Sequence, residues 1–191
     1  VDDQALDAHA YALLASEARL ASFFAIAKGD VPTRHWFHLG RTLTPLGRFS
    51  ALQSWSGSMF EYLMPSLIMH EPAGSLLALS NNAAVRRQIA YGQHLNIPWG
   101  ISESQYYALD REQNYQYSGF GVPELGLKRG LSENTVIAPY ASGLAAMIDP
   151  VAACRNLDRL SRMGAHGDYG WYEAVDFTRA RLPEGVNSVV I

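Results

Sequence analysis

The sequence predicts an all-α fold in which pairs of helices are joined by long loops. Apolar residues recur at helical spacing over residues 7–28, 74–95 and 150–164. No alternation of strands and helices typical of a parallel sheet occurs, and strand-like runs are few and short. The chain has 191 residues, 48% of them hydrophobic, which is enough for one domain with a buried core.

The first half of the chain reads as helix, loop and broken helix. After the helix over residues 7–28, Pro32 opens a short helical segment that is expected to end at Gly40. Residues 40–58 have the Gly, Pro, Ser and Thr content of a loop. A helix is expected over residues 60–69, kinked or broken by its internal proline.

The second half begins with the helix over residues 74–95, which Pro98 terminates. Residues 98–133 are expected to be the longest irregular region, and loops of this length are usually functional. Helical spacing resumes over residues 135–148. An Asp-Pro pair at 149–150 then supplies an N-cap and a proline at the first helical position.

Composition excludes several classes of function. A net charge of −3 gives no electrostatic basis for binding nucleic acid or anionic lipid. No apolar run approaches the roughly 20 residues of a membrane span. Cys154 is the single cysteine, so no internal disulfide forms, and it is predicted to be a core thiol. The acidic start and the strand-like end suggest a fragment of a longer protein.

One short element recurs. An aromatic residue, a glycine and, three residues after the glycine, a glutamate occur in residues 99–103 and again in 169–173, with a looser version in 55–61. Glycine allows a tight turn or a close approach to a ligand, and the aromatic ring offers a flat face on which sugars stack. Each glutamate is expected in the first turn of a helix. The three glutamates are Glu61, Glu103 and Glu173.

Two interpretations of these glutamates stay open. A helix N-terminus stabilises the ionised carboxylate, whereas burial beside an aromatic ring raises its pKa. Two carboxylates in such unlike environments, facing one another across a cleft, could cleave or transfer a glycosidic bond. The alternative is that each glutamate only caps its helix.

Aromatic and basic side chains in and near these elements are the candidates for contacting sugar. Each of these side chains could equally pack a loop or lie solvated on the surface. His35 and His38 lack further ligands, and residues 119–124 lack the third glycine of a dinucleotide loop, so neither a metal nor a cofactor is expected. The candidates for contacting sugar are Arg48, Trp55, Trp99, Tyr115, Tyr117, Phe120, Tyr169 and Trp171.

Longer motifs carry a family resemblance over nearly the whole chain, from about residue 11 to 183. They are LLASEARLASFFAIAKGDVPTRHWFHLGR, SWSGSMFEYLMPSL, RRQIAYG, PWGISES, YQYSGFGVPELGLKRGL, VIAPYASGLAAMIDP and YGWYEAVDFT. Together they resemble the glycoamylase-like domain of bacterial cyclic β-1,2-glucan synthases, which are very large inner-membrane proteins. The resemblance implies an α/α toroid, a six-fold barrel of inner and outer helices with the active site at one mouth.

The resemblance also implies a function. This domain would lie in the cytoplasm, take β-1,2-glucan as substrate and close linear chains into rings by transglycosylation, beside other domains of the same polypeptide. Glu103 is the expected acid/base and Glu173 the expected nucleophile, with Glu61 placing substrate or water. Alternatives are hydrolysis of the kind that endo-β-1,2-glucanases perform, or a non-catalytic glucan-binding segment.

The length departs from a complete toroid. Twelve helices of about 11–12 residues with their loops need roughly 350–400 residues, and the 191 residues here are about half of that. Residues 1–191 are therefore expected to be a single, partial domain whose flanking segments are missing.

Overall fold

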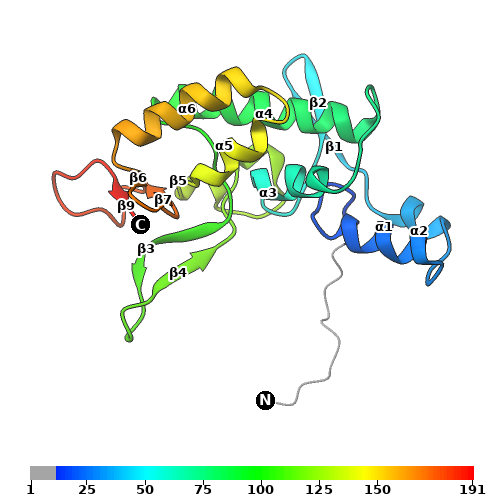
Figure 1. Cartoon of the computed structure of the whole chain (residues 1–191), viewed down its shortest axis with the longest axis horizontal. Coiled ribbons are helices and arrows are strands. Elements are labelled where there is room, and N and C mark those ends of the chain that lie inside the picture. The colour runs from blue at the N-terminus through cyan, green and yellow to red at the C-terminus, as the bar shows by residue number, and fades with distance from the viewer. Residues whose placement is uncertain (1–11) are drawn as a thin grey trace.

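A computed structural model describes residues 12–191. Helices form the body of the molecule, and β-hairpins project from it (Figure 1). The part of the expected first helix at residues 7–11 lies outside the described residues. The helices are α1 Arg19–Lys28, α2 Arg34–His38, α3 Met59–Leu63, α4 Leu76–Leu95, α5 Pro139–Ala145 and α6 Pro150–Arg162, with 3-10 turns η1 Met64–Leu67, η2 Pro123–Leu125 and η3 Leu131–Glu133.

The core lies where α3, α4, α5 and α6 meet. α3 packs against α4 and α5, and α5 packs against α6. Tyr62 and Leu63 of α3, Val85 of α4, Ala145 of α5 and Leu160 of α6 are all buried in one apolar cluster. Burial of this cluster is the dominant favourable term for the arrangement of the four helices.

Local signals set the ends of the two long helices. The Ser75 side chain caps α4 by accepting the N–H of Ala78, and Asn96 ends it in the left-handed conformation. The Asp149 side chain caps α6 in the same way, with Pro150 at the first helical position. The helices expected over residues 74–95 and 150–164 are therefore confirmed.

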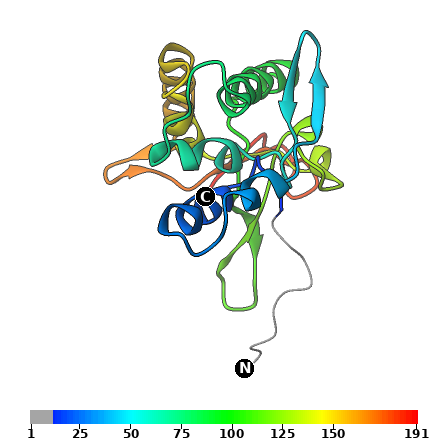
Figure 2. The same ribbon diagram turned by 90° about the vertical axis from the view of Figure 1, so that its right-hand side faces the viewer.

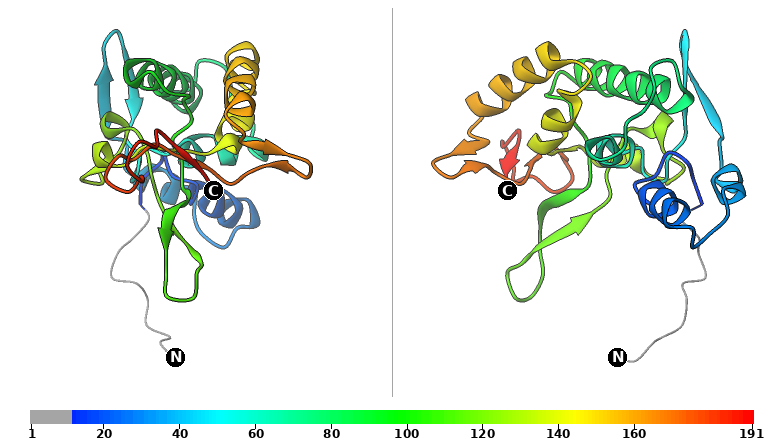
Figure 3. Two further views of the ribbon diagram at one scale, coloured as in Figure 1. Left: turned by 90° about the vertical axis from the view of Figure 1, so that its left-hand side faces the viewer. Right: turned by 45° about the vertical axis from the view of Figure 1, so that its right-hand side comes forward.

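The strands form small antiparallel sheets. The β1–β2 and β3–β4 hairpins project from opposite ends of the body in every view (Figures 2 and 3). The three-stranded sheet has the order β5-β8-β9 and joins the end of the chain to the segment before α5. The strands are β1 Leu43–Leu46, β2 Phe49–Leu52, β3 Ser104–Leu109, β4 Tyr115–Ser118, β5 Val136–Ile137, β6 His166–Gly167, β7 Gly170–Trp171, β8 Val175–Asp176 and β9 Val189–Val190.

The all-α prediction is wrong at the two regions expected to be loops. Residues 40–58 contain the β1–β2 hairpin, which turns at Gly47 in the left-handed conformation. Residues 98–133 contain the β3–β4 hairpin, whose turn is held by Asp110 accepting the N–H groups of Glu112 and Asn114. In β4 the tyrosines at 115 and 117 alternate with polar residues, a pattern that favours a strand even beside glycines.

The remaining helix predictions are partly confirmed. In the described residues, α1 begins at Arg19 instead of continuing the helix from residue 7, because residues 12–18 form turns. The segment expected as helix over 135–148 first forms β5 and then α5. The helix over 60–69 breaks as predicted, with α3 passing into η1 at the internal proline. Cys154 is exposed on α6, so its prediction as a core thiol is wrong.

Within residues 12–191, no helix is both long and apolar enough to cross a membrane.

Candidate functional site

Glu103 lies where the core ends and the β3–β4 hairpin begins. Ile101, two residues before Glu103, is held by the side chain of Gln88. The Ile101 N–H donates to Gln88 Oε1 at 2.9 Å, and the Ile101 carbonyl accepts from Gln88 Nε2 at 2.8 Å. Ile101 also forms an antiparallel bridge with Ile137. Glu103 directly precedes β3, which begins at Ser104, so the prediction that Glu103 lies in the first turn of a helix is wrong.

The Glu103 carboxyl is half-buried and electrostatically perturbed. Burial raises its pKa above the usual glutamate value, and the negative charge of Glu17 raises the pKa further. The Tyr117 hydroxyl hydrogen-bonds the carboxylate and lowers the pKa, which opposes part of this effect. The combined shift is upward, so the carboxyl keeps its proton to higher pH than an ordinary glutamate.

Glu173 reaches the same hairpin from the other end of the chain. Its backbone N–H donates to the carbonyl of Ile191 at 3.1 Å, just before β8, so this glutamate does not begin a helix either. Its exposed carboxylate accepts the backbone N–H of Gln105 at 3.2 Å, two residues after Glu103. The charges of Glu103 and Glu173 both help to raise the pKa of Tyr117, to about 12, after desolvation.

Glu61 has a different environment from Glu103 and Glu173. It is the third residue of α3, is only 5% exposed, and forms a capping box with Ser58. Oε1 accepts the backbone N–H groups of Trp55 and Ser56 at 2.9 and 3.1 Å. Oε2 accepts the hydroxyls of Ser54, Ser56 and Ser58 at 2.9, 2.6 and 3.1 Å, and the Ser58 N–H at 3.0 Å. The carboxylate is fully engaged in folding this turn.

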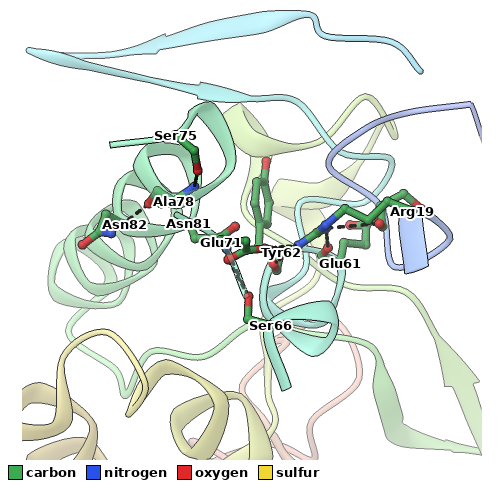
Figure 4. A network of polar contacts seen from close by, with 10 residues as sticks. Arg19, Glu61, Tyr62, Ser66, Glu71, Ser75, Ala78, Asn81 and Asn82 are labelled. Carbon is green, nitrogen blue, oxygen red and sulfur yellow. Dashed lines mark hydrogen bonds and ion pairs between the residues drawn. The ribbon is translucent and has the colours of Figure 1, made fainter. Parts of the chain in front are cut away.

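The segment that carries Glu17 is anchored by a buried arginine. Arg19 donates to the carbonyls of Glu61 and Tyr62 in α3 at 2.9 and 2.7 Å, and pairs with Glu71 at 3.1 Å. Figure 4 shows this guanidinium lying between the start of α1 and α3. Glu71 is itself held by Ser66 and Asn81.

Glu17 lies within the first family motif but was not identified as a site residue, because its segment was expected to be uniformly helical and it is not part of the recurring aromatic-Gly-x-x-Glu element. The turns of residues 12–18 and the Arg19 anchor bring it near Glu103, which is 86 positions further along the chain. Ser16 Oγ donates to the Glu17 carboxylate at 3.2 Å. No local sequence signal predicts such a long-range approach.

Two aromatic residues predicted to bind sugar are in the core. Trp99 is 7% exposed, its backbone is hydrogen-bonded on both sides by Asn156, and its Cβ lies where a side chain on Gly92 would be. Phe120 is 5% exposed and packs edge to face on Tyr106. Neither ring has a free face, so the prediction of stacking is wrong for both.

The other predicted binding residues are exposed but do not all gather at Glu103. Tyr115 and Tyr117 lie on β4, and Tyr169 and Trp171 lie on the β6–β7 hairpin. Trp55 follows β2, where its carbonyl accepts the N–H of Lys128. The structure places Arg48 at the tip of the β1–β2 hairpin, at the opposite end from β3–β4 (Figure 1).

The solved structure of an endo-β-1,2-glucanase from Chitinophaga pinensis, in complex with sophorotriose and glucose, shares this fold. The two chains superpose with a TM-score of 0.54 at 15% identity, over 82% of this chain and 40% of the glucanase chain. The solved structure of a "putative glucoamylase" from Bacteroides fragilis NCTC 9343 also shares the fold, with a TM-score of 0.55 at 17% identity over 79% of this chain and 38% of that chain.

The chain belongs to the glycoamylase family, described as "Putative glucoamylase", whose model matches residues 9–189. It is 58% identical, over all 191 residues, to the cyclic beta-(1,2)-glucan synthase NdvB from Rhizobium meliloti (strain 1021). The chain spans 7% of the length of that relative.

Proposed function

We propose that this chain carries the catalytic face of a domain that acts on β-1,2-glucan and closes linear chains into rings by transglycosylation. The observation that carries the proposal is Glu103, a half-buried carboxyl with a raised pKa beside a second acidic residue and a tyrosine hydroxyl. A carboxyl with a raised pKa suits the role of an acid that protonates a leaving oxygen. The high identity to a relative named as a cyclic β-1,2-glucan synthase supports the substrate and the reaction.

Glu103 is the acid/base in this proposal. In the first step the C1–O2 bond of the glucan breaks, and Glu103 gives its proton to the departing O2 while a carboxylate bonds C1 from the opposite face. In the second step the 2-hydroxyl at the far end of the same chain gives its proton to Glu103. The oxygen of this hydroxyl then bonds C1 and displaces the carboxylate from it, so the β configuration is restored and a ring is released.

The partner carboxylate is the open choice between Glu17 and Glu173. The sequence predicted Glu173, but the charges that raise the pKa of Glu103 are those of Glu17 and, to a smaller extent, Glu61, whose carboxylate is already engaged by residues 54–58. Glu173 instead accepts a backbone N–H from Gln105 and acts on the pKa of Tyr117. We therefore assign the nucleophile to Glu17 and a supporting role to Glu173. A retaining mechanism needs the two carboxyl groups about 5–5.5 Å apart.

Glu61 is assigned a structural role. The prediction that it places substrate or water requires a free carboxylate oxygen, whereas both of its oxygens already accept hydrogen bonds from residues 54–58. Its contribution to the reaction is the fixed start of α3, to which Arg19 attaches the segment that carries Glu17.

Exposed aromatic side chains near the two glutamates form the proposed sugar-binding surface. Tyr117 is 60% exposed on β4 and interacts with Glu103, and Trp171 is exposed two residues before Glu173. Tyr115 and Tyr169 extend this surface, and Trp55 contributes a separate exposed ring. Arg48 has no part in it, because it lies on the far hairpin.

The remaining parts of the proposal concern the whole polypeptide. Other domains of the same protein supply the linear glucan, and this domain works on the cytoplasmic side of the membrane as a partial barrel completed by flanking segments. The chain spans 7% of the length of its relative, which supports the presence of further domains with other tasks.

Azide rescue distinguishes the two candidate nucleophiles. In the full-length gene product, Glu17→Ala is expected to abolish ring formation from linear β-1,2-glucan. Azide then enters the vacated space on the α face and gives a chain with an α-glucosyl azide end. Glu173→Ala in the same assay is the matched control and gives no such product. Formation of the α-azide by Glu173→Ala alone would return the nucleophile to Glu173.

The products distinguish the alternative reactions. A ring weighs one water less than a linear chain of equal length, so mass spectrometry separates cyclisation from the hydrolysis that the structural neighbour's name describes. A non-catalytic glucan-binding role would be indicated if neither product formed and Glu103→Gln left glucan binding unchanged.

A further inference from the structure

Tyr140 meets the backbone of Glu103 from α5. The chain before α5 runs beside residues 100–103, since the Ala138 N–H donates to the carbonyl of Gly100 at 3.0 Å. This pairing brings Tyr140 Oη to 2.9 Å from the carbonyl oxygen of Glu103 and 2.8 Å from Ser102 Oγ. Tyr140, 37 positions away, thus contacts both the side chain of Ser102 and the backbone carbonyl of Glu103.

The hydrogen-bond directions follow from the groups present. A phenol has one hydrogen, and the Glu103 carbonyl can only accept it, so the Ser102 hydroxyl donates to Tyr140 Oη. Ser102 Oγ in turn accepts the backbone N–H of Phe60 at 3.0 Å. A continuous chain of hydrogen bonds therefore runs from α3 through Ser102 and Tyr140 to the backbone of Glu103.

The Tyr140 ring, although the residue is 37% exposed, also has a packing contact. Phe60 packs edge to face on it, with ring centroids 6.3 Å apart and an interplanar angle of 85°. Burial first, and then the charge of Glu103, raise the pKa of Tyr140 above the ordinary tyrosine value, so the phenol remains a donor across the working range of pH.

We propose that Tyr140 is a positioning residue, whose hydroxyl fixes the Ser102–Glu103 backbone and thereby aims the Glu103 carboxyl. This inference rests on the proposed role of Glu103. The backbone on the other side of Glu103 leads directly into the projecting β3–β4 hairpin, so movement of that hairpin would otherwise reach the carboxyl. Misplacing an acid/base group by about 1 Å costs on the order of 100-fold in rate.

Tyr140→Phe removes only the hydroxyl and tests the proposal. Tyr62→Phe is the matched control, because Tyr62 also loses a hydroxyl that donates to a backbone carbonyl, that of Leu52 at 2.6 Å. In the full-length gene product acting on linear β-1,2-glucan, Tyr140→Phe is expected to lower kcat about 10- to 100-fold with KM within about twofold. The alkaline limb of the pH profile of kcat is also expected to shift, because the substitution changes the environment of the Glu103 carboxyl. Tyr62→Phe, corrected for folded fraction, is expected to change neither.

Amide hydrogen exchange gives a second readout that does not depend on activity. Peptides covering residues 102–109 should exchange roughly fivefold faster in Tyr140→Phe, as expected for one lost hydrogen bond, and at the wild-type rate in Tyr62→Phe. The proposal is overturned if Tyr140→Phe keeps the wild-type kcat, pH profile or exchange, or if both variants lose kcat equally. An inactive wild-type protein would refute the proposed function instead, and the exchange experiment would still decide whether Tyr140 fixes this backbone.

Discussion

Replacing Glu61 by Gln should destabilise the start of α3. Backbone N–H groups donate to each carboxylate oxygen, from Trp55 to Oε1 and from Ser58 to Oε2. The amide of Gln must place its NH₂ group at one of these oxygens, so one buried donor loses its acceptor in either orientation. The remaining bonds also change from charge-assisted to neutral hydrogen bonds.

The magnitude follows from these contacts. An orphaned buried donor costs about 1–3 kcal/mol, and the weakening of the other bonds brings the expected loss to about 2–5 kcal/mol. Amide hydrogen exchange in the full-length gene product measures this loss locally. Exchange of peptides covering residues 54–61 should quicken at least about 30-fold, the equivalent of about 2 kcal/mol.

Glu173→Gln is the control for this prediction. Its carboxylate is exposed and accepts one backbone hydrogen bond, so the free energy of local opening should change by less than about 0.5 kcal/mol. The structural assignment of Glu61 would be refuted if Glu61→Gln left exchange over residues 54–61 unchanged yet abolished conversion of β-1,2-glucan. That result would make Glu61 a catalytic group.

Two further predictions concern the pH dependence and the core. Tyr117→Phe removes a hydrogen bond that lowers the pKa of Glu103, so this pKa should rise and the alkaline limb of kcat/KM should move to higher pH; a limb that stays or moves down contradicts the interaction. Gly92→Ala places a Cβ 2.8 Å from the Cβ of Trp99 and should destabilise the fold by about 1–3 kcal/mol, measured by hydrogen exchange of α4. Gly143→Ala in α5, with no atom within 4 Å of the new Cβ, should instead stabilise its helix by about 0.5–1 kcal/mol, and equal effects of the two variants would refute the packing argument.

The helices that the sequence predicts well are those with local signals at their ends. α4 and α6 each have a side-chain N-cap, and α6 adds a proline at its first position. The hairpins were missed because their strands are only four to six residues long and lie among Gly, Pro, Ser and Thr residues that favour a loop prediction. Pairing with a second strand, which decides the matter, depends on residues 10 or so positions away.

The recurring aromatic-Gly-x-x-Glu element shows where local pattern stops being informative. Both glycines adopt positive φ, 108° at Gly100 and 125° at Gly170, so the turn was predictable. The aromatic residues before them differ completely: Trp99 is buried and Tyr169 is fully exposed. Burial of Trp99 requires Gly92 on α4 and Asn156 on α6, and no short motif encodes those neighbours.

Some residues of the candidate site were identified from local sequence patterns, and others were not. Glu103 and Glu173 were identified from their motif, and the structure brings both to Tyr117. Glu17 and Tyr140 were not identified, because each reaches Glu103 through tertiary contacts that involve Arg19 and the strand before α5. The sequence therefore identifies the acid/base candidate, while the residues that surround it emerge only from the fold.

Product analysis of Glu103→Gln tests whether Glu103 is the acid/base of ring closure. The full-length gene product and this variant would be incubated with linear β-1,2-glucan, and the products weighed by mass spectrometry. The wild type is expected to give rings, each one water lighter than the linear chain of equal length, and Glu103→Gln is expected to give none. Ring formation by Glu103→Gln at the wild-type rate would contradict it.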